Sequence, residues 1–381
     1  MVLQHFDKKD FLENFWQQKP LVIRRAFDNA TWIEADELAG LACESEIESR
    51  IVLQESRSWK VEHGPFPENR FSTLPKTHWT LLVQGVDQWV PDVADILKSF
   101  DFLPAWRLDD IMVSYAPVGG TVSQHYDFFD VFLIQGEGSR IWQIGDVCGS
   151  HSAYLPDIPV RILKDFEAKM EVTLQPGDML YIPAKHAHYG VSVEDSVTYS
   201  VGFRAPSIRD VVDGVSTAAL EHLLEDERFE DGLLSLGAER AEISVDAINH
   251  IKAMLLKVVS DESLIRSWLG QYVTERKYPE HEVLPSDLDD YFERLQEGES
   301  LIKHPSARFA YVVRDERKAI LFVDGEEYLS SVALAKYISN QYELDSDILI
   351  KLLSSEQDKK VVEALILAGA LVFEDDFLED E

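Results

Sequence analysis

The sequence predicts an α+β protein in which a β-sandwich or barrel is followed by helices and then by a small mixed domain. Short β-type segments separated by Gly and Pro turns fill residues 111–205. Apolar stripes at helical spacing follow between residues 207 and 276, and the last hundred residues mix both patterns. The 381 residues, 45% of them hydrophobic, suffice for two or three domains with buried cores.

Before the β-rich region, residues 1–110 mix short helices and strands. The patterns predict helices near residues 11–16 and 37–43, and strands over residues 21–24 and 59–63. Six tryptophans fall here, and we interpret four of them as core residues: Trp16, Trp32, Trp59 and Trp79.

The β-rich region contains seven predicted strands with little room for helices between them. They cover residues 111–115, 131–134, 140–144, 171–174, 179–182, 188–193 and 197–203, with turns at residues 136–138 and 175–178. Many short strands in succession are typical of a double-sheet jelly roll or barrel.

The rest of the chain, from residue 207 onward, is predicted to contain a helical segment and a mixed domain. A pair of amphipathic helices outside a barrel is a plausible dimer surface, so we expect a homodimer. Tyr278-Pro279 and Pro285 mark a linker. Beyond it we predict a winged-helix type of domain, with helices near residues 288–295, 332–342 and 361–367, strands over 309–313 and 320–323, and a hairpin at Asp324-Gly325.

Charge limits the classes of partner. The chain has 36 Lys+Arg and 69 Asp+Glu, a formal net charge of −33. Nucleic acid and anionic membranes both need a basic surface, so neither is expected as the main partner. Residues 280–381 contain 10 basic and 25 acidic residues, a balance of −15. The winged-helix-like domain is therefore expected to contact proteins and not DNA.

Composition also indicates the compartment. The two cysteines, Cys43 and Cys148, are too far apart for a CxxC pattern, and so few cysteines suggest a reducing environment. The first ten residues lack the apolar core of a signal peptide, and the longest apolar-or-small stretch, residues 364–373, is too short to cross a bilayer. We therefore expect a soluble, cytoplasmic protein.

The chemistry is predicted to lie at His125-Tyr126-Asp127. In a strand, residues i and i+2 share a face, so the imidazole and the carboxylate would project together. Two histidines and one carboxylate form the facial triad of non-haem Fe(II) oxygenases. The third ligand should come from a later strand, where His186 and His188 both fit by parity. The alternative is that these are ordinary core histidines.

Two further residues are candidates for binding a carboxylate cosubstrate. Arg140 begins a strand and alternates with apolar Trp142 and Ile144, so its charge would be buried and would need an anion. Ser114 could add a hydroxyl to the same carboxylate. The alternatives are a rim arginine paired with Glu137 or Asp146, and an ordinary polar strand residue.

Taken together, these motifs resemble the JmjC-domain 2-oxoglutarate- and Fe(II)-dependent oxygenases, and most closely their bacterial ribosomal-oxygenase branch. The resemblance covers essentially the whole chain, including FLENFWQQKPLVIRRAF, WRLDDIMVSYA, HYDFFDVFLIQGEGSRIWQIG, LQPGDMLYIPAKHAHYG and SVTYSVGFRAP. It implies a double-stranded β-helix, cupin-like core in a JmjC domain of residues 1–206, a helical dimerisation segment of residues 207–277 and an acidic winged-helix-like domain of residues 278–381.

The resemblance also implies the site. The iron ligands map onto His125, Asp127 and His188, the last because Pro183, His188 and Gly190 match the family pattern. Arg140 and Ser114 map onto the 2-oxoglutarate contacts. His186 departs from the pattern and could compete or act beside the ligands. Tyr126, Phe128, Phe129 and Asp130 lie beside the site, but core packing explains the two phenylalanines equally well.

The implied reaction is hydroxylation of an unactivated C–H bond, with Fe(II) as cofactor and with 2-oxoglutarate and O2 as cosubstrates. Bacterial members of this branch hydroxylate the β-carbon of an arginine in ribosomal protein sixteen of the large subunit. We therefore expect a basic ribosomal protein as substrate. The alternatives are a ribosomal histidyl hydroxylase, a lysyl demethylase, or a non-catalytic acidic module that binds basic proteins.

Overall fold

The computed structural model describes residues 3–55, 58–224, 226–231, 241–277 and 291–374. The chain forms two compact units, Met1–Ala205 with Lys277–Glu282, and Pro206–Arg276 with Val283–Glu381. Whether the helical segment of residues 207–277 is a domain of its own stays a prediction.

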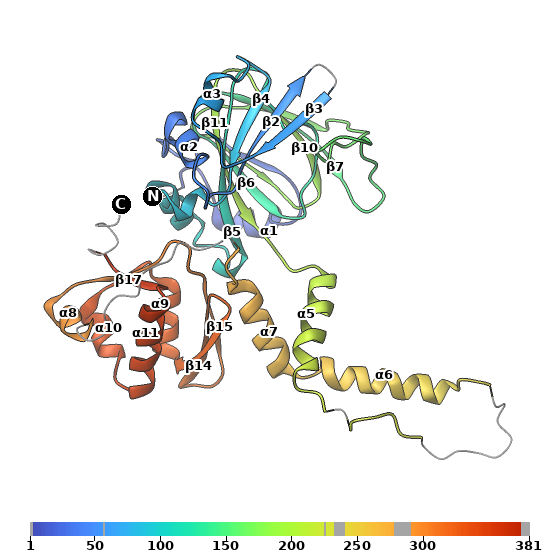
Figure 1. The fold of residues 1–381 in the computed structure, drawn as a ribbon, viewed down its shortest axis with the longest axis vertical. Coiled ribbons are helices and arrows are strands. Elements are labelled where there is room, and N and C mark those ends of the chain that lie inside the picture. Colours follow the sequence, from blue (N-terminus) through green and yellow to red (C-terminus); the bar gives the residue numbers. More distant parts are fainter. Residues whose placement is uncertain (1–2, 56–57, 225, 232–240, 278–290, 375–381) are drawn as a thin grey trace. The chain divides into compact units, whose positions relative to one another are not determined.

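The described part of the first unit contains two antiparallel sheets that face each other (Figure 1). The larger sheet has the order β1-β9-β6-β11-β5-β4-β2-β3, and the smaller one the order β10-β7-β8. The strands are β1 (Leu21–Ile23), β2 (Ser49–Glu55), β3 (Ser58–His63), β4 (Trp79–Val83), β5 (Leu108–Ala116), β6 (Asp130–Gln135), β7 (Arg140–Val147), β8 (Met170–Leu174), β9 (Met179–Ile182), β10 (His186–Ser192) and β11 (Ser196–Phe203). This is the expected double-sheet core, and all seven predicted strands of residues 111–203 are confirmed.

Short helices of the N-terminal region pack on the outer face of the larger sheet. They are α1 (Lys8–Asn14), α2 (Ala35–Leu41), α3 (Asn69–Ser72), α4 (Pro91–Ala94), η1 (Val86–Gln88), η2 (Asp95–Phe100) and η3 (Ala105–Arg107). The main apolar core lies here and includes Phe11, Phe100 and Phe132. Trp32 and Trp79 are buried in it and Trp16 packs against it, as expected, whereas Trp59 is only half-buried.

The sequence analysis did not predict β2 and β4. Ile51, Val52 and Leu53 form a continuous apolar run, and every residue of β4 is buried. Such runs lack the alternation that marks a half-buried strand, so periodicity alone does not separate them from buried helix. Together with β3, these strands extend the larger sheet beyond β5.

The second unit begins with helices and ends in the mixed domain. The helices are α5 (Ile208–Leu220), α6 (Val245–Val259), α7 (Glu262–Thr274), α8 (Tyr291–Glu297), α9 (Val332–Asn340), α10 (Ser346–Leu352) and α11 (Glu356–Leu367). The strands are β12 (Leu301–Lys303), β13 (Phe309–Val313), β14 (Lys318–Val323), β15 (Glu326–Ser331), β16 (Glu343–Leu344) and β17 (Leu371–Phe373). The predicted hairpin at Asp324-Gly325 joins β14 to β15, whereas the predicted linker lies outside the described residues.

Sequence signals fix several element boundaries. Ser207 caps α5 in a reciprocal capping box with Asp210, and Ser244 caps α6. In the turn of residues 175–178, the Asp178 carboxylate accepts hydrogen bonds from the backbone N–H groups of Gln175 and Arg25. This turn therefore holds β9 against β1. Among the described helices, none combines the length and the apolar character that crossing a bilayer requires.

Candidate functional site

Part of the inner face of the larger sheet is polar, and its side chains can form hydrogen bonds to a ligand. Ser114 lies opposite Thr198 in the β5–β11 ladder, and Thr198 lies opposite Gln135 in β6. All three residues are buried. Beside them, Leu133 and Leu180 of the larger sheet join Trp142 of the smaller sheet in an apolar cluster. A cavity of about 590 Å³ opens between the two sheets.

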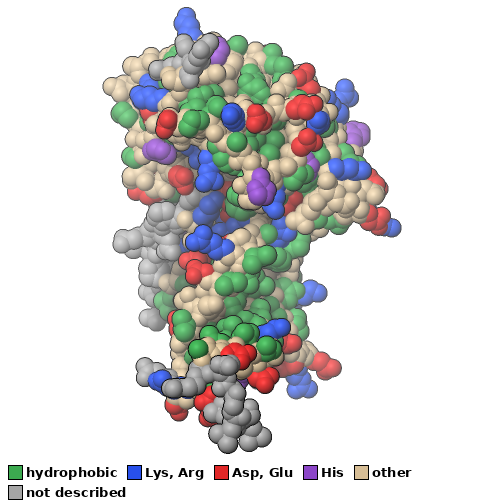
Figure 2. Space-filling view, turned by 90° about the vertical axis from the view of Figure 1, so that its right-hand side faces the viewer, with side chains coloured by type: hydrophobic (Ala, Val, Ile, Leu, Met, Phe, Trp, Pro, Cys, Tyr) green, Lys and Arg blue, Asp and Glu red, His purple; other side chains and the backbone are tan. Residues whose placement is uncertain are grey.

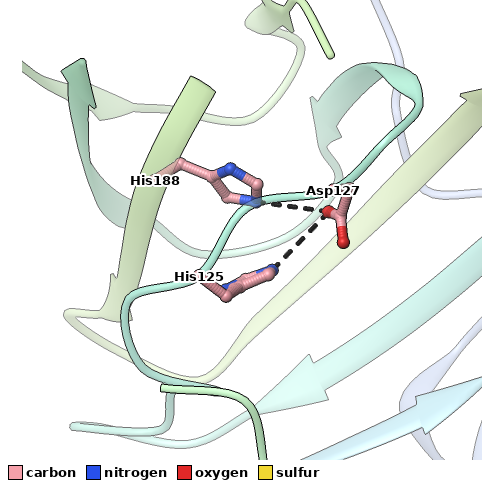
Figure 3. A group of neighbouring side chains, drawn as sticks. All are labelled: His125, Asp127 and His188. Atoms are coloured by element: carbon pink, nitrogen blue, oxygen red, sulfur yellow. Dashed lines mark ion pairs between the residues drawn. The ribbon is translucent and has the colours of Figure 1, made fainter. Parts of the chain in front are cut away.

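Three candidate ligand side chains converge in this cavity. Ligand atoms of His125, Asp127 and His188 lie within 4.8 Å of one another. The Nε2 atoms of His125 and His188 are 3.7 and 3.6 Å from Oδ2 of Asp127, and all three groups point toward one another (Figure 3). The structure therefore brings the predicted triad together.

The local conformation differs from the expected strand. His125 forms a single antiparallel bridge with His188, with N–H to carbonyl distances of 3.0 and 2.8 Å, and residues 126–129 are irregular. The chain leaves the ladder after this bridge, and the N–H of Lys185 then donates to the carbonyl oxygen of Asp127 at 2.6 Å. These backbone hydrogen bonds, and not strand alternation, direct Asp127 toward the histidines.

Backbone contacts orient both imidazoles. Nδ1 of His125 is 2.9 Å from the carbonyl oxygen of Ser123, and Nδ1 of His188 is 3.0 Å from that of His186. A carbonyl oxygen accepts, so each Nδ1 donates to it, and each Nε2 is left to bind a metal ion beside Asp127. Burial, together with the nearby His125, holds the pKa of His188 well below its ordinary value. Two imidazoles and a carboxylate fit a divalent transition metal such as Fe(II).

His188, and not His186, belongs to this group among the described residues. The register of β10 against β7 shifts between them, because His186 lies opposite Val147 and His188 lies opposite Ile144. Gly190 contributes to the setting of His188, since a Cβ there would come within 2.7 Å of the Trp142 ring. The indole can therefore pack beside His188, with ring centroids 6.0 Å apart.

Arg140 lies buried in the same cavity and has no carboxylate partner in the part of the chain that the structure describes. It is 5% exposed, and its guanidinium donates to the hydroxyl oxygen of Ser192 at 3.1 and 3.2 Å and to that of Ser114 at 3.4 Å. Burial lowers its pKa to about 10. Within the described residues it forms no ion pair with Glu137 or Asp146, so the alternative of a rim arginine is wrong.

Ser192, the second serine that contacts Arg140, was not predicted from the sequence. It lies directly opposite Arg140 in the β10–β7 ladder, and its hydroxyl is 2.8 Å from that of Ser196. A signal was available, because Ser192 alternates with His188 along the predicted strand of residues 188–193 and therefore shares its inner face. The hydroxyls solvate the guanidinium without neutralising it, so an anion remains the missing partner.

An acidic group at another part of the cavity wall was also missed. Asp110, Met112 and Ser114 alternate along β5 and all line the cavity, as does Asp109. The Asp110 carboxylate is 8% exposed and accepts a hydrogen bond from the N–H of Gly85 at 3.2 Å. The alternation in DDIMVS was the available signal, because Asp110 lies four residues before the candidate Ser114.

The residues after Asp127 have different environments. Phe128 and Phe129 are 60% and 40% exposed and line the cavity, so their interpretation as core residues is wrong. Asp130 is buried and accepts hydrogen bonds from the Tyr181 hydroxyl at 2.7 Å and from Arg107 at 3.2 Å. Phe128 and Phe129 are therefore available to a ligand, whereas Asp130 anchors the start of β6.

Both parts of the chain match known protein families. A JmjC domain matches residues 95–211, and a ROXA-like winged helix matches residues 257–372. The chain is 36% identical to the ribosomal protein uL16 3-hydroxylase of Escherichia coli K12, over 77% of this chain and 79% of that protein. It is 33% identical to a probable ribosomal oxygenase of Haemophilus influenzae, over 98% and 96%. It also matches the structure of YcfD, a ribosomal oxygenase from E. coli, in complex with cobalt and 2-oxoglutarate, with a TM-score of 0.86, 31% identity and coverage of 98% and 99%.

Proposed function

The chain belongs to the JmjC-domain ribosomal oxygenases, and we propose that it is an Fe(II)- and 2-oxoglutarate-dependent hydroxylase of an arginine β-carbon in ribosomal protein uL16. The observation that carries this proposal is a buried arginine with no acidic partner among the described residues, in the same cavity as two histidines and a carboxylate. A site of this composition needs a metal ion and a small anion at once. A ribosomal substrate would place the enzyme in the cytoplasm.

His125, Asp127 and His188 would hold the iron. The Nδ1 contacts of His125 and His188 fix the two imidazole rings in the metal-free protein, so these side chains need little ordering when the metal binds. Once bound, Fe(II), 2-oxoglutarate and O2 supply the oxidising chemistry, which converts 2-oxoglutarate to succinate and CO2 and delivers one oxygen atom to a C–H bond.

Arg140 and Ser114 would bind the distal carboxylate of 2-oxoglutarate. A guanidinium and a carboxylate form paired, charge-assisted hydrogen bonds, and burial strengthens them because water does not compete. The carboxylate would also compensate the charge of Arg140, which three serine contacts leave unneutralised. The small apolar cluster with Trp142 would keep water from this end of the cavity.

The acidic part of the cavity suits an arginine as the target side chain. Asp110 is a buried carboxylate on the same strand face as Ser114, and a guanidinium is its natural partner. Phe128 would cover the aliphatic part of such a side chain from the rim. The net charge of −33 would attract a strongly basic protein and raise its rate of encounter.

Incubation of the full-length protein with Fe(II), 2-oxoglutarate and a uL16 peptide tests this proposal. Tandem mass spectrometry should show one added oxygen atom, located on an arginine β-carbon. An oxygen on a histidine would favour the histidyl hydroxylase, and loss of a methyl group from a methylated lysine would favour the demethylase. No change in the peptide, under conditions where 2-oxoglutarate binds, would contradict the substrate assignment.

We also propose that the protein is a homodimer. Helices α5 and α6 expose many apolar side chains, and Figure 2 shows hydrophobic side chains gathered over this segment. Examples are Ile208, Val212, Leu220, Leu255 and Val245, which are 84%, 60%, 71%, 64% and 70% exposed. Such a patch on one amphipathic segment fits a second copy of the same segment, because symmetric pairing covers both at once.

Light scattering tests the dimer. The wild-type protein should have twice the mass of the 43.4 kDa chain, and the variant Val212→Glu/Leu255→Glu should shift toward one chain. The matched variant Val313→Glu changes an exposed valine of β13 and should leave the mass unchanged. A wild-type mass of one chain at micromolar concentration would refute the dimer.

A further inference from the structure

Two buried carboxylates of the cavity wall already have a cation between them. The Lys277 ammonium lies 2.9 Å from Oδ2 of Asp109 and 3.8 Å from Oδ2 of Asp110. The carboxylate side chains are 5% and 8% exposed, whereas Lys277 is 33% exposed. All three residues belong to the first unit and line the cavity that contains the metal-ligand group.

We propose that Lys277 is a resident cation that the target side chain of the substrate displaces from Asp110. The proposal rests on the proposed function, since it concerns how a cationic side chain enters the site. It assigns to Lys277 a role in affinity and product release, and not in the oxidation itself.

Charge balance supports an exchange. Arg204 lies 3.8 Å from Oδ1 of Asp109, so Lys277 and Arg204 each place a positive charge within 4 Å of this pair of carboxylates. A guanidinium that entered while Lys277 stayed would place a second cation beside the buried Asp110, and like charges at such a distance repel each other. If Lys277 leaves Asp110 as the guanidinium arrives, one cation replaces another beside this carboxylate.

The distances from Lys277 to the two carboxylates fit its displacement from Asp110. Lys277 is close to Asp109 but 3.8 Å from Asp110, beyond hydrogen-bond distance, and Asp110 is held from its other side by the N–H of Gly85. Lysine is a point charge on a flexible stem, whereas a guanidinium offers several N–H donors in one plane. The arginine can therefore replace the weaker Lys277–Asp110 interaction with directed hydrogen bonds. The returning lysine would then assist release of the product.

Binding to full-length, metal-free protein tests the exchange by calorimetry, with a uL16 peptide and with the same peptide carrying glutamine in place of the target arginine. Lys277→Gln should bind the arginyl peptide at least about threefold more tightly, because its competitor is gone. Lys277→Arg should bind it more weakly, since arginine can engage both carboxylates. Affinity for the glutaminyl peptide should not change. Lys169→Gln, a matched change at an exposed lysine paired with Glu167, should also have no effect.

The outcomes separate the possible explanations. Weaker arginyl binding in both Lys277 variants would show a merely structural role and overturn the proposal. Equal affinities in wild type and Lys277→Gln would also overturn it, while leaving the proposed function intact. If neither the wild type nor Lys277→Gln binds the arginyl peptide, the proposal and the assignment of an arginine substrate both fail.

Discussion

Replacing Arg140 by methionine should have opposite effects on stability and on cosubstrate binding. In the protein without 2-oxoglutarate, the guanidinium is buried, contacts serine hydroxyls and has no anion among the described residues. Methionine removes this desolvated charge with a similar volume, so the unliganded fold should become more stable. The same change removes the proposed partner of the distal carboxylate.

The magnitude follows from the pKa of Arg140. Burial lowers that pKa from 12.5 to about 10, and each pH unit corresponds to about 1.4 kcal/mol, so the buried charge costs about 3 kcal/mol. Methionine also loses the hydrogen bonds to the serines, and this loss offsets about 1–2 kcal/mol of the gain in stability. The net gain of about 1–2 kcal/mol should raise Tm by about 2–4 °C. Loss of a buried ion pair with 2-oxoglutarate should cost about 3–4 kcal/mol, or 100- to 1,000-fold in its KM.

Thermal unfolding with and without 2-oxoglutarate and Co(II) measures both effects. Wild-type protein should be strongly stabilised by the ligands, whereas Arg140→Met should start from a higher Tm and gain almost nothing. Arg70→Met is the matched control, because Arg70 has a carboxylate partner in Glu62 at 2.7 Å and lies outside the cavity. It should lower Tm and leave the KM for 2-oxoglutarate unchanged. An unchanged KM in Arg140→Met would refute the reasoning.

Three further predictions concern the metal, the buried lysine and the charge. Asp127→Ala should abolish Co(II) binding in titration calorimetry while the metal-free protein still unfolds cooperatively; retained tight binding would contradict the ligand assignment. Burial lowers the pKa of Lys303 from 10.5 to about 8, so between those values the folded state has lost a proton that the unfolded state keeps. Its contribution to stability therefore rises with pH across that window. Lys303→Met should stabilise the protein by about 3 kcal/mol at pH 7, and this gain should disappear by about pH 10.5 in denaturant titrations. Changing the exposed Glu316, Glu343 and Asp347 to their amides should raise the KM for a basic ribosomal protein and flatten its salt dependence; no change in either would indicate that this charge serves solubility.

Sequence patterns predicted the strands of the site region because Gly and Pro turns bound them clearly. They did not predict β2, which has a continuous apolar run, or β4, which is buried on both faces, because neither shows the alternation of a half-buried strand. In the second unit, β12, β16 and β17 were missed because two or three residues form too short a window for periodicity.

For the site, spacing predicted that His125 and Asp127 would converge, but through a strand that does not exist. The actual cause is the His125–His188 bridge together with the contact from Lys185 to Asp127, which are long-range interactions that local spacing does not reveal. The sequence could not show whether Arg140 lies at the rim or inside the cavity, because both positions have the same sequence pattern. Its burial in the structure shows that it lies inside. Lys277 was missed because it lies 167 residues from Asp110 and only the fold brings the two together.

The most direct test of the proposed function follows the oxygen atoms of isotopically heavy dioxygen during turnover with a uL16 peptide. If this site couples 2-oxoglutarate oxidation to hydroxylation, one heavy atom should appear in succinate and one on the arginine β-carbon, and both should be absent with Asp127→Ala. Heavy oxygen in succinate alone, with an unmodified peptide, would contradict the proposed substrate, and none in either product would contradict the proposed chemistry.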